Sequence, residues 1–253
     1  MTTSSDSDLA SASPSPEGKG PGDRSSGGLL PALRQVAGAD AVEHVSAAYP
    51  NSPGLRVTPS TAENLAGCLQ VAGEVGATVA PWGGGTQQRL GYPPAQLDLA
   101  VSTARLDAIV EWEPRDLTAC IQAGATLEKV QSALAEQGQQ LPIDAPAALR
   151  ATVGGLVATN TSGPRRWLYG GWRDQIIGMQ MALPSGDVVK SGGRVVKNVQ
   201  GYDLAKLFIG SLGTLGVVTQ VNVKLTPLPA FRRLFVARGH LEGVGALLDD
   251  LFA

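Results

Sequence analysis

Apolar residues recur along the first half of the chain at helical spacing. Within residues 59–76, Leu65 and Leu69 follow this spacing, and the segment carries a polar residue at its start and a glycine at its end. Ser60 is therefore expected as the N-cap of a helix that stops at Gly76. A second helix is expected where Leu127, Val130 and Leu134 repeat ahead of Gly138. Short apolar runs predict strands, the first of them buried, at 77–81, 97–102, 108–114 and 117–124.

The second half continues the alternation of strands and helices. Gly154 and Gly155 open a small-residue run that predicts a short helix over 156–161, ended by Gly163 and Pro164. Ser185-Gly186 indicates the turn of a hairpin over 175–192. A helix over 203–211 and a long strand over 215–229 follow. The pattern predicts an α+β fold.

The two ends of the chain differ from its middle. Residues 1–28 are rich in Ser, Gly, Pro and Asp and lack an apolar core, so we expect a disordered tail. They show neither the apolar region of a signal peptide nor the Arg-rich pattern of a transit peptide. No apolar run is long enough for a membrane span, so a cytoplasmic protein is expected. After the Pro227 and Pro229 boundary, residues 229–253 predict one strand and one helix.

Composition narrows the chemistry. The 253 residues are 43% hydrophobic and carry a formal net charge of −2, with Lys and Arg scattered, so no footprint for nucleic acid or an anionic membrane is visible. Cys68 and Cys120 lie far apart and form no cluster with histidine, which argues against a disulfide framework, a zinc site or an iron–sulfur centre. A small-molecule ligand fits this composition best.

Three consecutive glycines, Gly83 to Gly85, follow the first predicted strand. One interpretation is a tight turn. The other is an anion-binding nest, in which exposed N–H groups face a phosphate and the hydroxyl of Thr86 adds a donor. The loop is not a Walker motif, and Gln88 stands where the last glycine of G-x-G-x-x-G belongs. A second glycine cluster, 210–219, precedes a strand, which is also wrong for a Rossmann unit.

The order of four blocks is more specific than any single one. "PWGGGTQQ", "ATVGGLVATNTSG", "YGGWRDQIIGMQMALPSGDVV" and "GYDLAKLFIGSLGTLGVVTQVNVKL" succeed one another. Over residues 45–228 this order resembles the FAD-binding domain of the vanillyl-alcohol oxidase/p-cresol methylhydroxylase (PCMH) family, and within it the E subunit of bacterial glycolate oxidase. The resemblance implies a PCMH-type domain of two α/β subdomains over 29–228. It also implies that 229–253 begin an incomplete C-terminal cap domain.

The resemblance further implies where FAD is held. The segment from Pro81 to Gln88 would wrap the pyrophosphate of FAD. The turn and helix that start at Thr152 would lie along the same cofactor. The backbone from Gly216 to Val218 would contact the adenine or the flavin. For Pro146 and Asp174, cofactor contact and plain turn formation or capping stay open. The implied cofactor-binding residues are Pro81, Gly83, Gly84, Gly85, Thr86, Gln87, Pro146, Thr152, Gly154, Gly155, Thr159, Ser162, Gly163, Gly216, Val217 and Val218.

The implied activity is removal of a hydride from a small 2-hydroxy acid by FAD, which carries this redox chemistry itself. Non-covalent FAD is expected, because neither His44 nor His240 lies in the glycine loop. No catalytic base is assigned. The polar residues near the glycine blocks could neutralise a carboxylate substrate or form a docking face; they are Arg165, Arg166, Trp167, Tyr169, Arg173, Lys197 and Tyr202.

The resemblance also implies partners, a second flavoprotein subunit and an iron–sulfur subunit, through which the protein could associate with a membrane. The short cap predicts that the isolated chain does not oxidise glycolate by itself. Two alternatives stay open. One is a non-catalytic FAD-holding or assembly subunit, and the other is a related flavin oxidoreductase that acts on another substrate.

Overall fold

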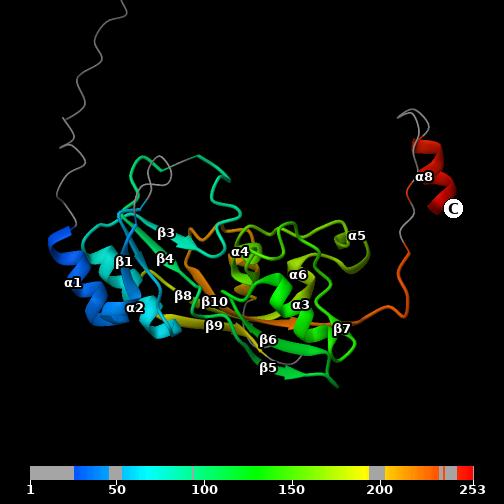
Figure 1. Ribbon diagram of the computed structural model, residues 1–253, viewed down its shortest axis with the longest axis horizontal. Helices are drawn as coiled ribbons and strands as arrows, with labels where there is room; N and C mark the ends of the chain where they lie inside the picture. The colour runs from blue at the N-terminus through cyan, green and yellow to red at the C-terminus, as the bar shows by residue number, and fades with distance from the viewer. Residues whose placement is uncertain are drawn as a thin grey trace, which may run out of the picture.

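The computed structural model describes residues 26–45, 53–92, 94–193, 203–233, 236 and 244–252. Two larger β-sheets lie next to each other along the long axis of the molecule (Figure 1). Each sheet has its own hydrophobic core, so the fold is of the α+β type with two α/β subdomains, as the sequence predicts. A two-stranded sheet, β7 (Gln139–Gln140) with β11 (Thr226–Pro227), lies at the far end of the second subdomain.

The first subdomain is a four-stranded mixed sheet covered by two helices. The strand order is β1-β2-β4-β3, with β1 antiparallel to β2 and the other neighbours parallel. Its core joins the apolar faces of both helices to β4, which is buried throughout. The elements are α1 (Ser26–Ala37), a 3-10 turn η1 (Ala39–Ala41), β1 (Val42–His44), β2 (Leu55–Val57), α2 (Ala62–Glu74), β3 (Val79–Trp82) and β4 (Leu99–Ser102).

The second subdomain is a five-stranded antiparallel sheet of order β5-β6-β10-β8-β9. Three helices, α3, α4 and α6, lie over one of its faces (Figure 1). Its strands are β5 (Ile109–Glu113), β6 (Thr118–Gln122), β8 (Ile176–Ala182), β9 (Val188–Gly192) and β10 (Val217–Lys224). Its helices are α3 (Leu127–Ala135), α4 (Val153–Ala158), α5 (Arg166–Tyr169), α6 (Trp172–Gln175) and α7 (Ala205–Phe208), and α8 (Val244–Phe252) follows near the C-terminus.

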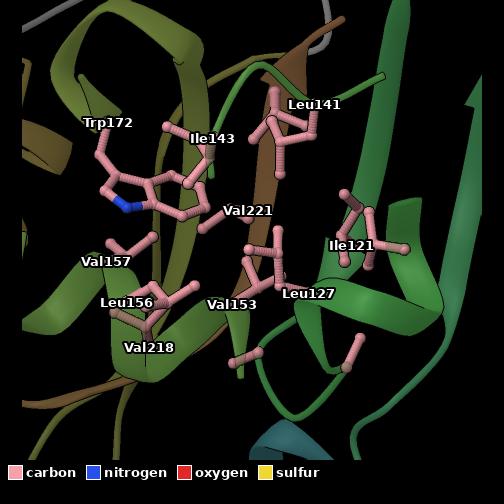
Figure 2. Close-up of a cluster of buried hydrophobic side chains, with 14 of the residues drawn as sticks. Ile121, Leu127, Leu141, Ile143, Val153, Leu156, Val157, Trp172, Val218 and Val221 are labelled. Carbon is pink, nitrogen blue, oxygen red and sulfur yellow. The ribbon is translucent and has the colours of Figure 1, made fainter. Parts of the chain in front are cut away.

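Trp172 anchors the second core. Its indole is fully buried beside Val157 and Leu156 of α4, and Val218 of β10 lies beneath them (Figure 2). The indole Nε1 donates a hydrogen bond to the carbonyl oxygen of Thr161, at 2.8 Å. This one side chain therefore fixes α6 to the segment that follows α4, because a buried indole N–H requires a partner.

The two cores meet at the beginning of β10. Val217 packs in the first core together with Ala182 at the end of β8, whereas Val218 packs in the second. Helix α2 contacts β8 and β9 as well as the first sheet. The subdomains are thus joined by packing as well as by the chain.

Most expected elements form, with shifted boundaries. Helix α2 is capped by Thr61, which accepts from the Asn64 N–H at 3.1 Å, so the Ser60 assignment is wrong by one residue. Gly76 follows this helix with φ +68°, as expected for a stop. Strand β3 is half-buried and lies at an edge of its sheet, a position that tolerates the missing N–H of Pro81. The expectation that this strand is buried is therefore wrong.

The short helix after the second glycine pair also differs. Helix α4 begins at Val153, so Gly154 and Gly155 form its first turn instead of preceding it. It ends at Ala158, before the expected Gly163 stop, because Asn160 turns left-handed with φ +51°. The hairpin of β8 and β9 forms as predicted, with Gly186 in its turn at φ +90°.

At the ends of the chain the structure tests the predictions only in part. Helix α1 begins at Ser26, so the expected tail ends three residues early, and its residues 1–25 lie outside the described residues. Helix α8 is the helix expected within 229–253. The strand expected before it stays a prediction, because residues 234, 235 and 237–243 lie outside the described residues. Among the described residues, no helix has both the length and the hydropathy to cross a membrane.

Candidate functional site

The glycine loop leaves the end of β3 and packs against the turn that precedes α4 (Figure 1). A β-carbon on Gly83 would overlap the hydroxyl of Thr152, and one on Gly84 would overlap the backbone carbonyl of Arg150. Gly85 has φ +70° and lies against the Trp82 indole, whose nearest atoms would be 3.3 Å from a β-carbon there. Contacts within the protein therefore favour glycine at positions 83 and 84, and the positive φ favours it at position 85.

This finding changes the expected reason for the glycines. The resemblance implies that the missing side chains admit a cofactor, whereas at Gly83 and Gly84 the space is taken by residues 150–152 of the same chain. The close approach fixes the loop in one place. Arg150 contributes a second contact, because its Nη2 donates to the Gly84 carbonyl oxygen at 3.4 Å.

The loop keeps its own N–H groups available. Within the described part of the chain, no group accepts a hydrogen bond from the backbone N–H groups of residues 83–86. The three glycines are half-buried, and Thr86 is exposed. A run of free N–H groups in a fixed turn is the arrangement that holds phosphate oxygens. The N–H groups are free because the packing of the loop against residues 150–152 leaves them without partners inside the protein.

The N-terminal end of α4 is tied to the second sheet. Thr152 caps the helix by accepting from the Gly155 N–H at 3.3 Å. The Gly154 N–H donates to the Ala123 carbonyl oxygen at 2.8 Å, and a β-carbon on Gly154 would lie 2.6 Å from the Ala123 side chain. Gly154 thus serves packing, and Thr152 connects the helix cap with the glycine loop.

The C-terminal end of α4 brings further predicted residues beside the loop. Thr159 and Thr161 are hydrogen-bonded through their hydroxyls at 2.7 Å, and Gln87 from the glycine loop donates to Thr161 at 3.5 Å. The hydroxyl oxygen of Ser162 is buried and has no hydrogen-bond partner among the described residues. A buried hydroxyl without a partner costs free energy, so Ser162 is suited to a polar ligand group.

The loop before β10 completes the cluster. Its Gly210 and Leu212 N–H groups donate to carbonyl oxygens of α4 at 3.1 and 2.8 Å. A β-carbon on Gly213 would lie 2.8 Å from the Pro81 ring, so this loop also contacts the end of β3. The side chains of Val217 and Val218 are buried in the two cores. Any contact from these two valines to a ligand must therefore come from their backbone.

Backbone strain gathers at the same place. Four non-glycine residues in the described part of the chain have positive φ, and three of them belong to the segments that converge here: Ala147, Asn160 and Leu212. Such conformations are uncommon outside glycine and persist where the surrounding structure enforces them. The cluster is therefore held in its shape by the fold.

Other predicted residues have structural roles or lie apart. Asp174 accepts from the Gly171 N–H at 2.8 Å, which is the capping role that the sequence left open. Pro146 is exposed in the turn before α4. Gly163 packs against Asp144, whose carboxylate accepts from the Arg165 N–H. Lys197, Tyr202 and His240 lie outside the described residues.

The remaining polar residues do not form one group at the glycine loop. Trp167 is 90% exposed, and Arg166 is exposed beside it. Arg173 donates to the Lys206 carbonyl oxygen at 3.4 Å. Sequence reasoning missed Arg150 and Trp82 as supports of the loop. The adjacency of Arg150 to the "ATVGG" block was the one signal available for it.

The residues present fit a dinucleotide that carries a pyrophosphate. Free N–H groups at 83–86, the exposed hydroxyl of Thr86 and the unpartnered hydroxyl of Ser162 are donors suited to phosphate and ribityl oxygens. Within the described part of the chain, no group of three or more His, Cys, Asp or Glu residues could hold a metal ion.

Comparisons with known proteins identify the family of this chain. Residues 53–192 match the family described as FAD binding domain. The chain is 33% identical to glycolate oxidase subunit GlcD of Bacillus subtilis (strain 168) over 206 residues, which are 81% of this chain and 44% of that protein. It is 38% identical to glycolate oxidase subunit GlcE of Escherichia coli (strain K12) over 148 residues, 58% of this chain and 42% of that protein.

Among solved structures, an alkyldihydroxyacetonephosphate synthase superposes with a TM-score of 0.69 at 22% identity, over 82% of this chain and 42% of that one. This likeness shows the fold. The chain spans less than half the length of these proteins. The family match covers more than half of the chain, and its range contains the glycine loop and α4. The chain therefore belongs to the PCMH-type family of FAD-binding domains, and its cofactor is FAD.

Proposed function

We propose that this chain is the FAD-binding part of a flavoprotein that oxidises a small 2-hydroxy acid such as glycolate. The observation that carries the proposal is the convergence of the turn before α4, the C-terminal end of α4 and the loop before β10 on the glycine loop and the end of β3, where the N–H groups of residues 83–86 are free. The named activity of the two glycolate oxidase relatives supports the substrate class.

In this proposal each segment has its own task. The N–H groups of 83–86 and the Thr86 hydroxyl hold the pyrophosphate, and Ser162 donates to a further cofactor oxygen. Gln87 keeps the loop beside Thr161. The backbone at Gly216 to Val218 lines the cofactor where the two cores meet. FAD held by these residues would supply the redox chemistry: it would take a hydride from the α-carbon of the 2-hydroxy acid, the hydroxyl proton would pass to a base that is not assigned or to water, and the 2-oxo acid would result.

The chain would act together with other subunits. We propose a second flavoprotein subunit and an iron–sulfur subunit as partners. Two relatives are named as subunits of glycolate oxidase, which supports an assembly of several subunits, and the kind of each partner is what the family resemblance implies. Affinity purification of the tagged chain from its own cells should bring down both. Recovery of the chain alone, with full flavin content and turnover, would contradict the subunit assignment.

Anaerobic addition of glycolate to the purified, FAD-loaded assembly tests the activity. The flavin absorption band should bleach with glycolate and stay unchanged with acetate, which lacks the hydroxyl group. Dithionite serves as the control that the flavin is reducible. An assembly that dithionite bleaches but that neither glycolate nor D-lactate bleaches would overturn the proposed function.

A further inference from the structure

A cavity of about 440 Å³ lies between α3, the segment that follows β7 and the segment that follows β11. Figure 1 shows this region where the chain leaves the second sheet beside β7. None of the residues assigned to FAD lines the cavity. Its volume is within the range of small-molecule sites. What it could bind follows from the charges in its wall.

Two arginines from distant parts of the sequence meet in that wall on one neutral atom. Arg165 Nη1 and Arg232 Nη2 donate to the same side-chain oxygen of Gln140, at 3.2 and 2.9 Å. Gln140 is 3% exposed and is fixed further by its amide, which donates to the Pro227 carbonyl oxygen at 3.5 Å. A neutral acceptor thus holds two positive charges close together without compensating them.

The acidic residues of the cavity compensate the arginines only in part. Asp144 lies 3.8 Å from Arg165 Nε, and its carboxylate also accepts from the Arg165 backbone N–H. Glu128 lines the cavity as well, in the first turn of α3. Within the described part of the chain, neither carboxylate forms an ion pair with Arg232. The guanidinium of Arg232 can therefore donate further hydrogen bonds to an anion and attract it by its positive charge.

The rest of the wall defines the other part of a ligand. Ala135, Ala148 and Leu228 contribute the accessible apolar surface, because the other large apolar residues of the wall, Leu127 and Ile143, are almost fully buried. Nearby amides such as that of Gln131 are already used in hydrogen bonds to the backbone. An anion with a short apolar chain would place its charge at the arginines and its chain on this surface. Planar guanidinium groups match the two oxygens of a carboxylate.

From this arrangement we propose that the cavity is a binding site for a small organic carboxylate, held by Arg165 and Arg232. The site is independent of the proposed flavin chemistry, since no residue of the glycine loop takes part. The carboxylate would replace or join Gln140 as the acceptor shared by the two arginines.

Calorimetric titration of the chain with butanoate and with butanamide tests the proposal, because the two differ mainly in charge. Butanoate should bind saturably and butanamide should not. Arg232→Gln should weaken butanoate binding about tenfold, the usual loss for one charge-assisted hydrogen bond. Arg115→Gln, at an exposed position outside the cavity, should leave the affinity unchanged. Arg165→Gln should act like Arg232→Gln.

Thermal unfolding of each variant checks that the fold is retained. Arg232→Gln should retain it, because Arg232 is exposed. Three outcomes overturn the proposal. The first is absence of saturable butanoate binding to the wild-type chain. The second is binding of butanoate by both arginine variants as tightly as by the wild type. The third is binding of inorganic phosphate as tightly as butanoate. Either of the first two outcomes would show that the two arginines do not form a binding site. The third outcome would show that the site has no preference for carboxylates.

Discussion

Gly84 has no room for a β-carbon, because the Arg150 carbonyl occupies the position where that atom would lie. A backbone obstacle cannot rotate away as a flexible side chain can. The same residue contributes an N–H to the free run at 83–86. The absence of a side chain at Gly84 therefore lets the loop pack against Arg150 and keeps the loop in the conformation in which its N–H groups are free.

Gly84→Ala should lower the free energy of unfolding by about 2 kcal/mol, a typical cost of overpacking. Gly28→Ala is the matched control, since nothing lies within 4 Å of a β-carbon there. That change should be neutral or slightly stabilising, because alanine favours a helix. Urea denaturation measures both. Equal stability of the two variants would show that the loop yields easily around residue 84.

A substitution at Thr86 should change FAD binding and leave the stability of the fold unchanged. Its side chain is exposed and has no hydrogen bond among the described residues. Thr86→Ala should therefore leave the stability of the apoprotein unchanged and weaken FAD binding by about 1 kcal/mol or more, the value of a hydrogen bond to a charged group. Flavin fluorescence titration measures the change. Thr86→Ser should restore affinity, and an alanine variant with wild-type affinity would exclude this hydroxyl from the site.

Among the elements, α4 depends strongly on its cap. The helix has six residues, too few to be stable alone, so it relies on Thr152 and on its packing against β6 and β10. Thr152→Ala should destabilise the protein by about 1 kcal/mol, measured by urea denaturation. Thr152→Ser keeps the hydroxyl and should recover most of this loss. An alanine variant as stable as the serine variant would contradict the capping role.

Helix α2 buries a cysteine in the first core. Burial raises the pKa of the Cys68 thiol to about 12, because the thiolate loses hydration. In the unfolded chain the thiol titrates near pH 8.5, so its contribution to stability is complete below that pH and is lost as the pH rises toward 12. Between pH 8 and about pH 10, wild type should lose about 2 kcal/mol more than Cys68→Ala. Parallel losses in denaturant titrations would contradict this assignment.

For the whole molecule, FAD binding should couple the two subdomains. The glycine loop follows a strand of the first sheet, whereas α4 and the loop before β10 belong to the second. FAD at about one hundred times its dissociation constant should add about 2.7 kcal/mol to the stability of the folded state. Hydrogen exchange should slow in α2 and in β10 alike. Protection confined to one subdomain would contradict a site that spans both.

Release of the cofactor tests the non-covalent attachment that the sequence predicts. Neither His44 nor a cysteine lies in the glycine loop, so no side chain is at hand there for a covalent bond to the flavin. Acid precipitation of the FAD-loaded protein should therefore leave all the yellow colour in the supernatant. Colour in the washed pellet would show a covalent link.

The sequence by itself determined most elements from residue 59 onward and the order of the glycine blocks, whereas α1, β1, β2, α5 and α6 were not predicted. Periodicity of apolar residues located α2, α3 and the hairpin of β8 and β9, because helix and strand spacing are properties of neighbouring residues. Local signals also located the ends of these elements to within a few residues. The resemblance of four ordered blocks is enough to identify the family and FAD.

Only the tertiary structure decided why the glycines are needed and what surrounds them. Gly84 meets Arg150, and Arg165 meets Arg232, across 66 and 67 positions of the sequence. No local pattern encodes such contacts, since they arise when two sheets and their loops pack together. The unpartnered hydroxyl of Ser162 and the edge position of β3 have the same origin. Spacing along the chain specifies which segments form, and packing between distant segments specifies which groups are left free to bind.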